Sequence, residues 1–331
     1  MNRPLVSVVM PVYNAEKYLQ AALDSILHQT YSNLDIIIIN DGSTDRSKEI
    51  ILNIKDARLR YFENPVNWGI VKTRNRALDE AKGDYIAVLD SDDIALPERI
   101  AVQVDFLEKN PDYGMCGSYF KTINGNDKIL KKARFPANDR DARSYLMLRN
   151  CFCHSTVMMR SGIAKEIKYN KEFEIVEDFM LWNQISQKSK IINLPVFTTY
   201  YRVHGNNIST TKRAHMFKLV NIINSQVLDD LKIKYSTEEL EIHSNSLISN
   251  SNFFREKGKL EKLENWIFRY LSEIKKNDLY NEVISFRVFA KRWIVLCNNS
   301  GNRNKMFFNR LILKYPGIYM NLLYNKVRTS L

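Results

Sequence analysis

The first 110 residues alternate short apolar runs with segments of helical periodicity, and this alternation constrains the fold more than any other feature. The apolar runs are rich in aliphatic residues, as is typical of strands that are buried on both faces. Alternation with short connections predicts a largely parallel sheet that is covered by helices. The expected strands are residues 5–10, 34–39, 58–62 and 85–89, and the expected helices are residues 18–27, 45–54, 70–81 and 97–109.

The rest of the chain follows a less regular pattern and then becomes helical. A stretch rich in Gly, Asn and Ser near residues 205–215 is expected to be a linker, and beyond it the apolar spacing is helical almost throughout. We therefore predict two domains, residues 1–211 and residues 212–331, of which the second is a helical appendage. Between residues 113 and 203 we expect strands with a hairpin at 124–127, helices at 139–148 and 176–189, and an extended segment at 190–203.

The charge of the chain is concentrated in its C-terminal third. The net charge is +12, and residues 212–331 hold 21 Lys and Arg against 11 Asp and Glu. No apolar stretch approaches the roughly 18 to 20 residues that cross a bilayer, and residues 1–4 lead directly into a strand without the apolar core of a signal peptide. We expect a cytoplasmic protein, with peripheral attachment to the inner face of the cytoplasmic membrane as an open alternative.

Three carboxylates follow the fourth expected strand. Asp90, Asp92 and Asp93 lie within four residues at its carboxyl end, where ligands bind in open α/β sheets. Like charges this close raise one another's pKa unless positive charge lies among them. A divalent cation such as Mg²⁺ or Mn²⁺ provides that charge and often keeps a substrate's phosphates in its shell. The pattern predicts a metal–diphosphate site, and an ordinary loop with a helix cap is the alternative.

Polar segments also follow the first two expected strands. Residues 11–14 read Pro-Val-Tyr-Asn, and residues 40–45 read Asn-Asp-Gly-Ser-Thr-Asp. Singly, each is typical of a turn or a helix cap. Because neither G-x-G-x-x-G nor G-x-x-x-x-G-K-[ST] occurs in the sequence, any nucleotide must be held in another way.

Taken together and in this order, these segments resemble family 2 glycosyltransferases of the GT-A fold. The resemblance extends from residue 5 to about residue 208. It implies an α/β fold with a Rossmann-like mixed sheet, helices on both faces, and an inverting enzyme that uses a nucleotide-diphosphate sugar. One departure is Lys72-Thr73, where the family usually has small residues. The matching segments are residues 6–14, 39–45, 67–75, 90–93, 177–178 and 201–204.

The donor site is expected at the strand ends. Pro11 and Tyr13 would give a flat wall on which a base can lie, and Asp41 would accept a hydrogen bond from the imino N–H of uracil. The guanidinium of Arg74 would bind a diphosphate or base, and the alternative is that Arg74 is a surface helix residue. By the resemblance, Asp92 is the first choice for direct metal ligation, with Asp90 on the ribose or the metal and Asp93 in an outer or capping role. The expected donor-binding residues are Pro11, Tyr13, Asp41, Asn67, Arg74, Asp90 and Ser91.

The resemblance also implies a catalytic base. Asp178 would take the proton from an acceptor hydroxyl as the hydroxyl oxygen attacks C1 of the donor sugar. A position at a helix N-terminus would help to keep Asp178 ionised. The alternative is that Asp178 reflects only the ordinary enrichment of acidic residues in a first helical turn. Trp182 is expected to be either a platform for a sugar ring or a core residue. Glu177 and His154 are expected near the acceptor, and His204 at the metal or phosphate.

Two other classes of protein share parts of this pattern. A haloacid-dehalogenase-like phosphatase also has D-x-D after a strand, but there the motif follows the first strand and supplies a nucleophile. A non-catalytic module that binds nucleic acid or membrane would explain the basic C-terminal region. Its basic residues are spread among aliphatics and aromatics, which favours an anionic lipid surface over nucleic acid, and a helical bundle with a solvated basic face is the alternative.

With the resemblance, the expected reaction is transfer of a hexose or N-acetylhexosamine from a UDP-sugar to a hydroxyl group, with Mn²⁺ or Mg²⁺ as cofactor. The acceptor is expected to be a saccharide or a lipid-linked saccharide in bacterial cell-surface polysaccharide assembly, such as lipopolysaccharide or capsule.

Overall fold

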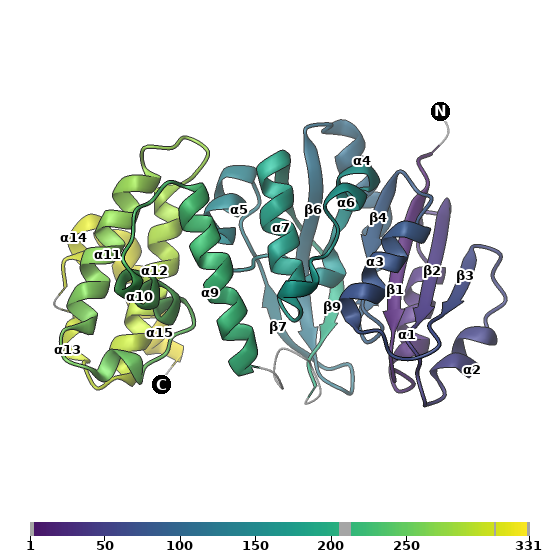
Figure 1. Ribbon diagram of the computed structural model, residues 1–331, viewed down its shortest axis with the longest axis horizontal. Helices are drawn as coiled ribbons and strands as arrows, with labels where there is room; N and C mark the ends of the chain where they lie inside the picture. Colours follow the sequence, from purple (N-terminus) through teal and green to yellow (C-terminus); the bar gives the residue numbers. More distant parts are fainter. Residues whose placement is uncertain (1–2, 205–212, 308, 330–331) are drawn as a thin grey trace. The chain divides into compact units, whose positions relative to one another are not determined.

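The chain forms two compact units in the computed structural model, which describes residues 3–204, 213–307 and 309–329. One unit contains Met1–Ala142 and Cys151–Lys212, and the other contains Arg143–Asn150 and Arg213–Leu331 (Figure 1). Most of the linker predicted at 205–215, and the domain boundary predicted at 211/212, lie outside the described residues.

The first unit is built on a mixed sheet. Its strand order is β3-β2-β1-β4-β8-β6-β9-β5, and β7 pairs with β6 beside this path. Strands β1 to β4 are parallel to one another, as the alternation predicted, whereas β8 is antiparallel to both β4 and β6. The carboxyl ends of β1, β2, β4 and β6 therefore lie at the same edge. The strands are β1 Val6–Val12, β2 Leu34–Asn40, β3 Leu59–Glu63, β4 Tyr85–Val88, β5 Ile94–Ala95, β6 Tyr113–Ile123, β7 Ile129–Ala133, β8 Met158–Arg160 and β9 Lys190–Arg202.

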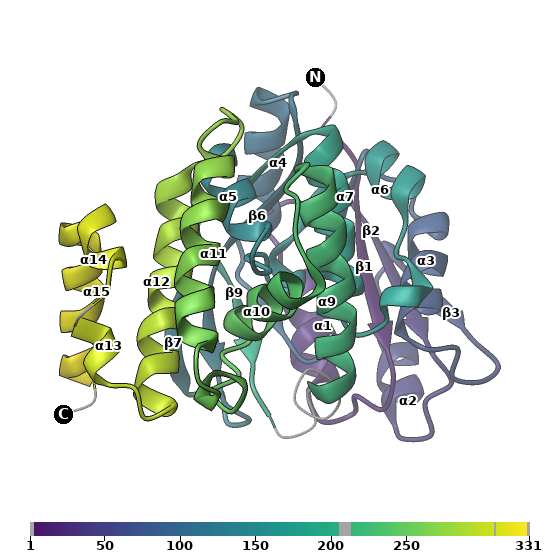
Figure 2. The ribbon, with the colours of Figure 1, turned by 60° about the vertical axis from the view of Figure 1, so that its left-hand side comes forward.

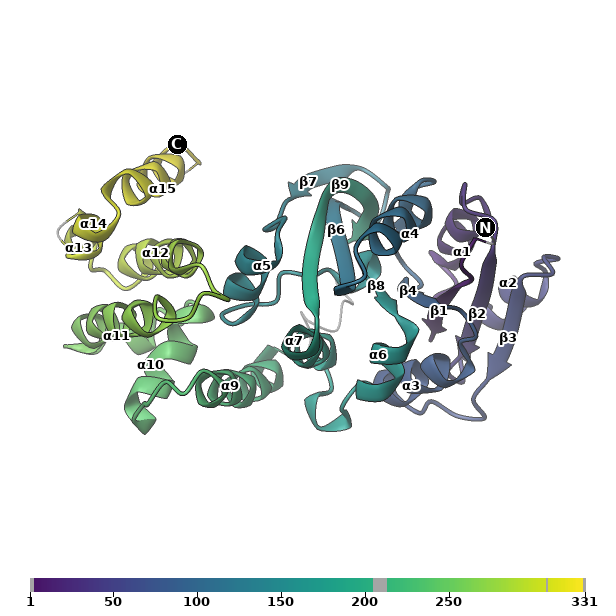
Figure 3. The ribbon, with the colours of Figure 1, turned by 90° about the horizontal axis from the view of Figure 1, so that it is seen from above.

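Helices cover both faces of this sheet, which explains why every residue of β1 and β2 is buried. Seen from above, α1 and α4 lie on one face, and α3, α6 and α7 lie on the other (Figure 3). Each strand and helix predicted in the first 110 residues begins and ends within about two residues of its observed limits. The helices are α1 Leu19–Leu27, α2 Ser47–Leu52, α3 Ile70–Glu80, α4 Arg99–Lys109, α5 Asp139–Leu146, α6 Ser161–Ile167 and α7 Glu177–Lys188, with short 3₁₀ turns η1 His154–Thr156 and η2 Lys171–Phe173.

The second unit is helical, as predicted (Figure 2). Capping interactions begin α10, where Ser236 and Glu239 each accept a hydrogen bond from the other's backbone N–H. In the described part of the chain, no helix has the length and apolarity needed to span a bilayer. The helices are α9 Arg213–Asp230, α10 Thr237–Leu247, α11 Lys259–Ile274, α12 Glu282–Asn299, α13 Asn304–Phe307, α14 Leu311–Lys314 and α15 Pro316–Thr329, with the 3₁₀ turn η3 Phe253–Arg255.

An aromatic cluster forms the core of the second unit. Trp266 donates its indole N–H to Nδ1 of His243 across 3.0 Å, and the rings of Tyr270 and Phe289 pack against the same imidazole. Burial lowers the pKa of His243 to about 3, so the ring is a neutral acceptor. Trp266, Tyr270 and Trp293 are buried, so they belong to the core of this unit. The expectation that the aromatics of the C-terminal region face lipid is therefore wrong for these three residues.

Candidate active site

Two loops are bonded together at the carboxyl ends of β1 and β2. The Asp41 N–H donates to the Val12 carbonyl (2.8 Å), and the Thr44 N–H donates to Oδ1 of Asn14 (2.8 Å). Gly42 has a φ of +70°, and a Cβ at this position would lie 2.6 Å from the carbonyl carbon of Val66. The turn therefore requires glycine, and it brings the segment around Val66 against the end of β2.

Asp41 organises the loop that leads into α3. Its carboxylate is almost fully buried and accepts hydrogen bonds from Asn64 Nδ2 (2.7 Å), the Trp68 N–H (2.9 Å) and the Gly69 N–H (3.1 Å). Asn67, in the same loop, is exposed, and its Oδ1 accepts from the Gly69 N–H across 2.8 Å. Asp41 thus already has three donors, and a contact with uracil stays a prediction that would use its remaining acceptor capacity.

The two residues of the predicted base wall differ in exposure. Pro11 is buried within β1, whereas Tyr13, directly after the strand, is 49% exposed. Of the pair, Tyr13 is the residue that offers a ring surface to a ligand.

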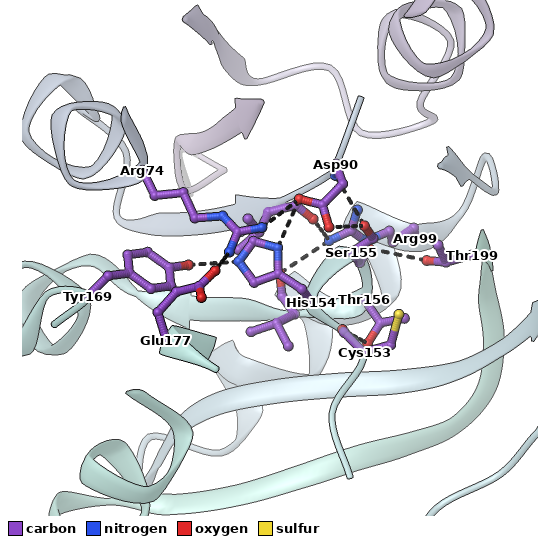
Figure 4. A network of polar contacts seen from close by, with 12 residues as sticks. Arg74, Asp90, Arg99, Cys153, His154, Ser155, Thr156, Tyr169, Glu177 and Thr199 are labelled. Atoms are coloured by element: carbon purple, nitrogen blue, oxygen red, sulfur yellow. Dashed lines mark hydrogen bonds and ion pairs between the residues drawn. The ribbon is translucent and has the colours of Figure 1, made fainter. Parts of the chain in front are cut away.

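Arg74 lies at the centre of a buried polar network (Figure 4). Its Nη2 donates to Oδ1 of Asp90 across 2.9 Å, its Nη1 pairs with Glu177, and its guanidinium lies 5.6 Å from the centroid of the Tyr169 ring. The side chain is about nine-tenths buried, so it is not a surface helix residue. Burial lowers the pKa of Arg74, but Asp90 and Glu177 raise it further than burial lowers it. Arg74 therefore joins the end of β4 to the start of α7.

Asp90 has further partners from η1. His154 Nδ1 lies 3.2 Å from Asp90 Oδ1, and the Ser155 hydroxyl donates to Oδ2 (3.3 Å). The other imidazole nitrogen of His154 is hydrogen-bonded to the Tyr169 hydroxyl at 2.9 Å. Burial raises the pKa of Asp90, but the nearby His154 and Arg74 lower it further, so that the net shift is downward. Asp90 is therefore held as a carboxylate.

The two predicted metal ligands lie within hydrogen-bonding distance of each other. Asp92 Oδ2 is 2.9 Å from Nε2 of His204, and the His204 ring stacks on Tyr18 with centroids 5.5 Å apart. Burial and the neighbouring Asp90 raise the pKa of Asp92. Ser91, between the two aspartates, is half-buried. Among the described residues, no three His, Cys, Asp or Glu side chains form a cluster suited to a metal ion.

Asp93, in the turn after β4, is bonded to the last residue of β9. It is fully buried and accepts the backbone N–H of Arg202 across 2.7 Å. Burial, together with Asp92 and Asp90, raises its pKa well above the usual range. In the first turn of α4 the Ile100 N–H is capped by Oε1 of Gln29 (3.1 Å), whereas Asp93 bonds to Arg202, so the capping role is wrong for Asp93 and the outer role remains.

Glu177 and Asp178 begin α7 after a strained residue. Ile175 has a φ of +90°, which is unusual for a β-branched side chain and marks a tightly determined entry into the helix. Oδ1 of Asp178 accepts the Phe179 N–H across 2.6 Å. Burial and the adjacent Glu177 raise the pKa of Asp178 to about 6, while His154 and Arg74 oppose the rise. At neutral pH Asp178 is therefore ionised, but it is more basic than an exposed aspartate.

Trp182 is fully buried, with its ring centroid 6.1 Å from that of His154. Trp182 is therefore a core residue beneath the network, which is one of the two roles expected for it, and not a platform for a sugar ring. Buried polar atoms without a hydrogen-bond partner among the described residues include Arg74 Nε, Glu177 Oε2 and Trp182 Nε1. Unsatisfied groups of this kind are rare in folded proteins and call for a functional explanation.

Several residues of the site were not found from the sequence. Tyr169 and Ser155 gave no signal, because they are single polar residues in irregular segments. Arg202 lay inside a matching segment without receiving a role. Arg99 is fully buried and donates Nη2 to the carbonyls of Val88 (2.7 Å) and Val157 (3.1 Å), beneath the end of β4. Arg99 is the first residue of α4, where a cation interacts unfavourably with the helix dipole. This unfavourable position is the sequence feature that could have indicated a special role for Arg99.

A mixed sheet with helices on both faces and acidic residues at its strand ends is the architecture of a GT-A glycosyltransferase. Residues 7–168 match the family model described as glycosyl transferase family 2. An uncharacterised glycosyltransferase of Haemophilus influenzae is 33% identical over 262 residues, which are 73% of this chain and 81% of that protein. The chain therefore belongs to glycosyltransferase family 2 and is a glycosyltransferase.

Two further comparisons agree with this assignment. The Escherichia coli protein WfaP, a UDP-Glc:alpha-D-GlcNAc-diphosphoundecaprenol beta-1,3-glucosyltransferase, is 33% identical over 222 residues, or 67% of this chain and 86% of WfaP. The crystal structure of S. aureus TarS 1-349 in complex with UDP-GlcNAc has a TM-score of 0.57 at 18% identity, covering 91% of this chain and 90% of that chain. The second likeness shows the fold.

Proposed function

We propose that this enzyme transfers a hexose or N-acetylhexosamine from UDP to a hydroxyl of a saccharide or lipid-linked acceptor, with inversion at the anomeric carbon, in bacterial cell-surface polysaccharide assembly. The observation that carries the proposal is the buried ion pair of Arg74 with both Asp90 and Glu177. It joins the strand end that would hold the donor to the helix that carries Asp178. WfaP supports the choice of UDP and of a lipid-linked acceptor, because both are in its name.

The donor would lie across the strand ends. Tyr13 offers an exposed ring for the uracil, and Asp41 lies one residue beyond the end of β2 with its backbone bonded to Val12. Asn67 is exposed in the loop that Asp41 organises, and Ser91 lies between the two aspartates of the turn after β4. Arg74 supplies a delocalised cation, and its unpartnered Nε is a donor available to a phosphate or ribose oxygen.

The donor set at Asp92 and His204 fits Mn²⁺ or Mg²⁺. A carboxylate oxygen and an imidazole nitrogen converge to 2.9 Å, and both side chains are about three-quarters buried. Two protein ligands suit a cation whose other positions are filled by substrate phosphates and water. When bound there, the cation would neutralise charge that develops on the leaving diphosphate.

Asp178 would act as the general base. Its pKa of about 6 places it close to neutral pH, where a carboxylate is ionised yet basic enough to accept the acceptor's hydroxyl proton. Glu177 is held by Arg74, and His154 is fixed between Asp90 and Tyr169, so both can position the acceptor without themselves moving. A single base and a direct attack by the hydroxyl oxygen on C1 produce inversion.

We further propose that residues 212–331 hold this otherwise cytoplasmic enzyme on the anionic inner face of the membrane, or grip a phosphorylated lipid-linked acceptor. Supporting this, Leu313 is 81% exposed, and Met320 and Tyr324 are also exposed, with Arg310 and Lys314 close to Leu313 in sequence. Apolar side chains among cations are typical of interfacial helices. Sedimentation with phosphatidylglycerol vesicles at low and high salt tests the proposal. Equal sedimentation of Leu313→Ser and the unchanged chain would contradict it.

Calorimetry tests the donor assignment. We expect UDP to bind in the presence of Mn²⁺ more tightly than GDP, and a panel of UDP-sugars to show turnover with one sugar preferred. GDP binding as tight as UDP binding would contradict the role of Asp41 and Tyr13 in base recognition.

A further inference from the structure

The hairpin formed by β6 and β7 carries an exposed strand of mixed apolar and basic character. Ile129 is 48% exposed and Leu130 is 54% exposed, and every residue from 128 to 132 is exposed. In the described part of the chain, β7 pairs with β6 alone, so its outer edge is uncovered. Lysines often protect such an edge from pairing with another chain, but that role does not explain two adjacent exposed aliphatic residues.

The cations of this strand lack acidic partners. Lys128, Lys131, Lys132 and Arg134 are exposed, and none has a carboxylate within ion-pair distance among the described residues. The neighbouring carboxylate, Asp127, is instead paired with the buried Arg202. The hairpin therefore presents concentrated positive charge without compensation.

Aromatic residues extend the same surface at the base of the hairpin. Arg134 lies 5.3 Å and Lys121 lies 5.7 Å from the centroid of the Phe197 ring, and Tyr119 packs on that ring at 5.6 Å. Val196, next to Phe197, is 39% exposed. Aliphatic and aromatic side chains interleaved with Lys and Arg are the composition of a surface that lies at a lipid headgroup region.

We propose that residues 128–134 dock on the anionic headgroups of a phospholipid bilayer. The positive charge of the strand argues against a second copy of this chain as the partner, because edge-to-edge pairing would bring two uncompensated sets of cations together. Nucleic acid would match the charge but would leave Ile129 and Leu130 without an apolar contact. An anionic bilayer satisfies both the cations and the aliphatic pair.

The hairpin is linked to the reacting edge of the sheet. Arg202 donates Nη1 to the Asn124 carbonyl (3.1 Å) in the hairpin turn, Nε to the Asp92 carbonyl (2.8 Å) and its backbone N–H to Asp93. Docking of the hairpin would therefore hold the Asp92–Asp93 segment at the lipid surface, where a lipid-linked acceptor would be reached. This inference goes beyond the proposed function, which places only residues 212–331 at a membrane, and it is independent of the sugar transferred.

The experiment is flotation of the full chain with vesicles of equal parts phosphatidylglycerol and phosphatidylcholine, at low and high salt. Two variants remove the two kinds of contact: Lys128→Gln with Lys131→Gln and Lys132→Gln, and Ile129→Ser with Leu130→Ser. Each is also made together with Leu313→Ser, so that residues of the second unit cannot mask the effect. The matched control is Lys55→Gln with Lys82→Gln and Lys109→Gln, three exposed lysines of the same unit.

We expect the lysine variant to bind vesicles at least roughly tenfold more weakly at low salt, the aliphatic variant to bind more weakly at both salt concentrations, and the control to bind normally. UDP affinity with Mn²⁺ should be unchanged in every variant, which shows that each is folded and separates this proposal from the donor assignment. Undiminished vesicle binding in both hairpin variants would overturn the proposal. Equal binding to pure phosphatidylcholine, or hairpin-dependent binding of poly-uridine RNA with no vesicle binding, would also overturn it.

Discussion

The backbone N–H of Arg202 donates to Oδ1 of Asp93 across 2.7 Å and so joins the last residue of β9 to the turn after β4. The two residues are 109 positions apart in the chain. The Arg202 side chain adds a second bond to this turn, from Nε to the Asp92 carbonyl at 2.8 Å. The turn that carries the three aspartates is therefore held from β9 as well as from β4.

Replacing Asp93 tests this support. In Asp93→Ala the buried Arg202 N–H loses its acceptor, and we expect a loss of about 1–3 kcal/mol in the free energy of unfolding. Asp93→Asn should lose less, because burial raises the pKa of Asp93 and makes its charged form costly in the fold. Urea denaturation measures both. The exposed Asp105→Ala on α4 is the control, and equal effects of Asp93→Ala and the control would show that the bond contributes nothing.

Removal of Arg74 should destabilise the fold and weaken donor binding together. Arg74→Met removes the cation that contacts both Asp90 and Glu177, although Asp90 keeps His154 and Ser155, and breaking a buried pair on one side costs about 3–5 kcal/mol. Arg74→Lys should restore only part of the loss, because one ammonium cannot reproduce the planar fork between two carboxylates. Urea denaturation and UDP calorimetry are the measurements. Asp79→Asn, an exposed change on the same helix, should leave UDP binding unaffected and alter stability by less than about 1 kcal/mol, because its ion pair with Lys168 is at the surface.

Asp178→Asn should keep UDP binding and lose transfer by about a hundredfold or more, the scale of general-base catalysis. Because the pKa of Asp178 is raised to about 6, the unchanged enzyme should gain activity as pH rises through that value, and the variant should lack this rise in activity.

The raised pKa of Asp178 also affects stability, because it means that the folded chain keeps a proton that the unfolded chain releases. Asp178 therefore lowers stability as pH rises from about 4 to about 6, and the variant should not show that decline. Normal turnover in Asp178→Asn would rule out its role as base.

Asp92→Ala and His204→Ala should each abolish the gain in UDP affinity that Mn²⁺ gives, because each removes one of two converging ligands. His28→Ala, at an exposed histidine, should retain the full gain. Calorimetry of UDP with Mn²⁺ and with a chelator decides the matter. An unchanged affinity after chelation would contradict the metal-binding role of both residues.

The local pattern of the sequence was enough to determine the helices and strands of the first 110 residues and the position of the acidic turn at a strand end. These features depend on neighbouring residues: aliphatic runs form buried strands, and turn residues follow them. The helical pattern of residues 176–189 likewise predicted α7. The segment at 201–204 was indicated by the family resemblance, which assigned no role to Arg202.

Tertiary packing decided how those segments meet. Whether Arg74 faces solvent or Glu177 depends on the helix that lies beside it, and Glu177 is 103 positions away. A tryptophan side chain suits a binding surface as well as a core, so the sequence alone does not decide between them for Trp182 and Trp266. Both are buried in the folded protein by the packing of neighbouring helices. The antiparallel insertion of β8 between β4 and β6 likewise depends on pairing between distant strands. Periodicity specifies which side of an element is apolar, but the partner that covers that side is chosen by long-range contacts that local pattern does not encode.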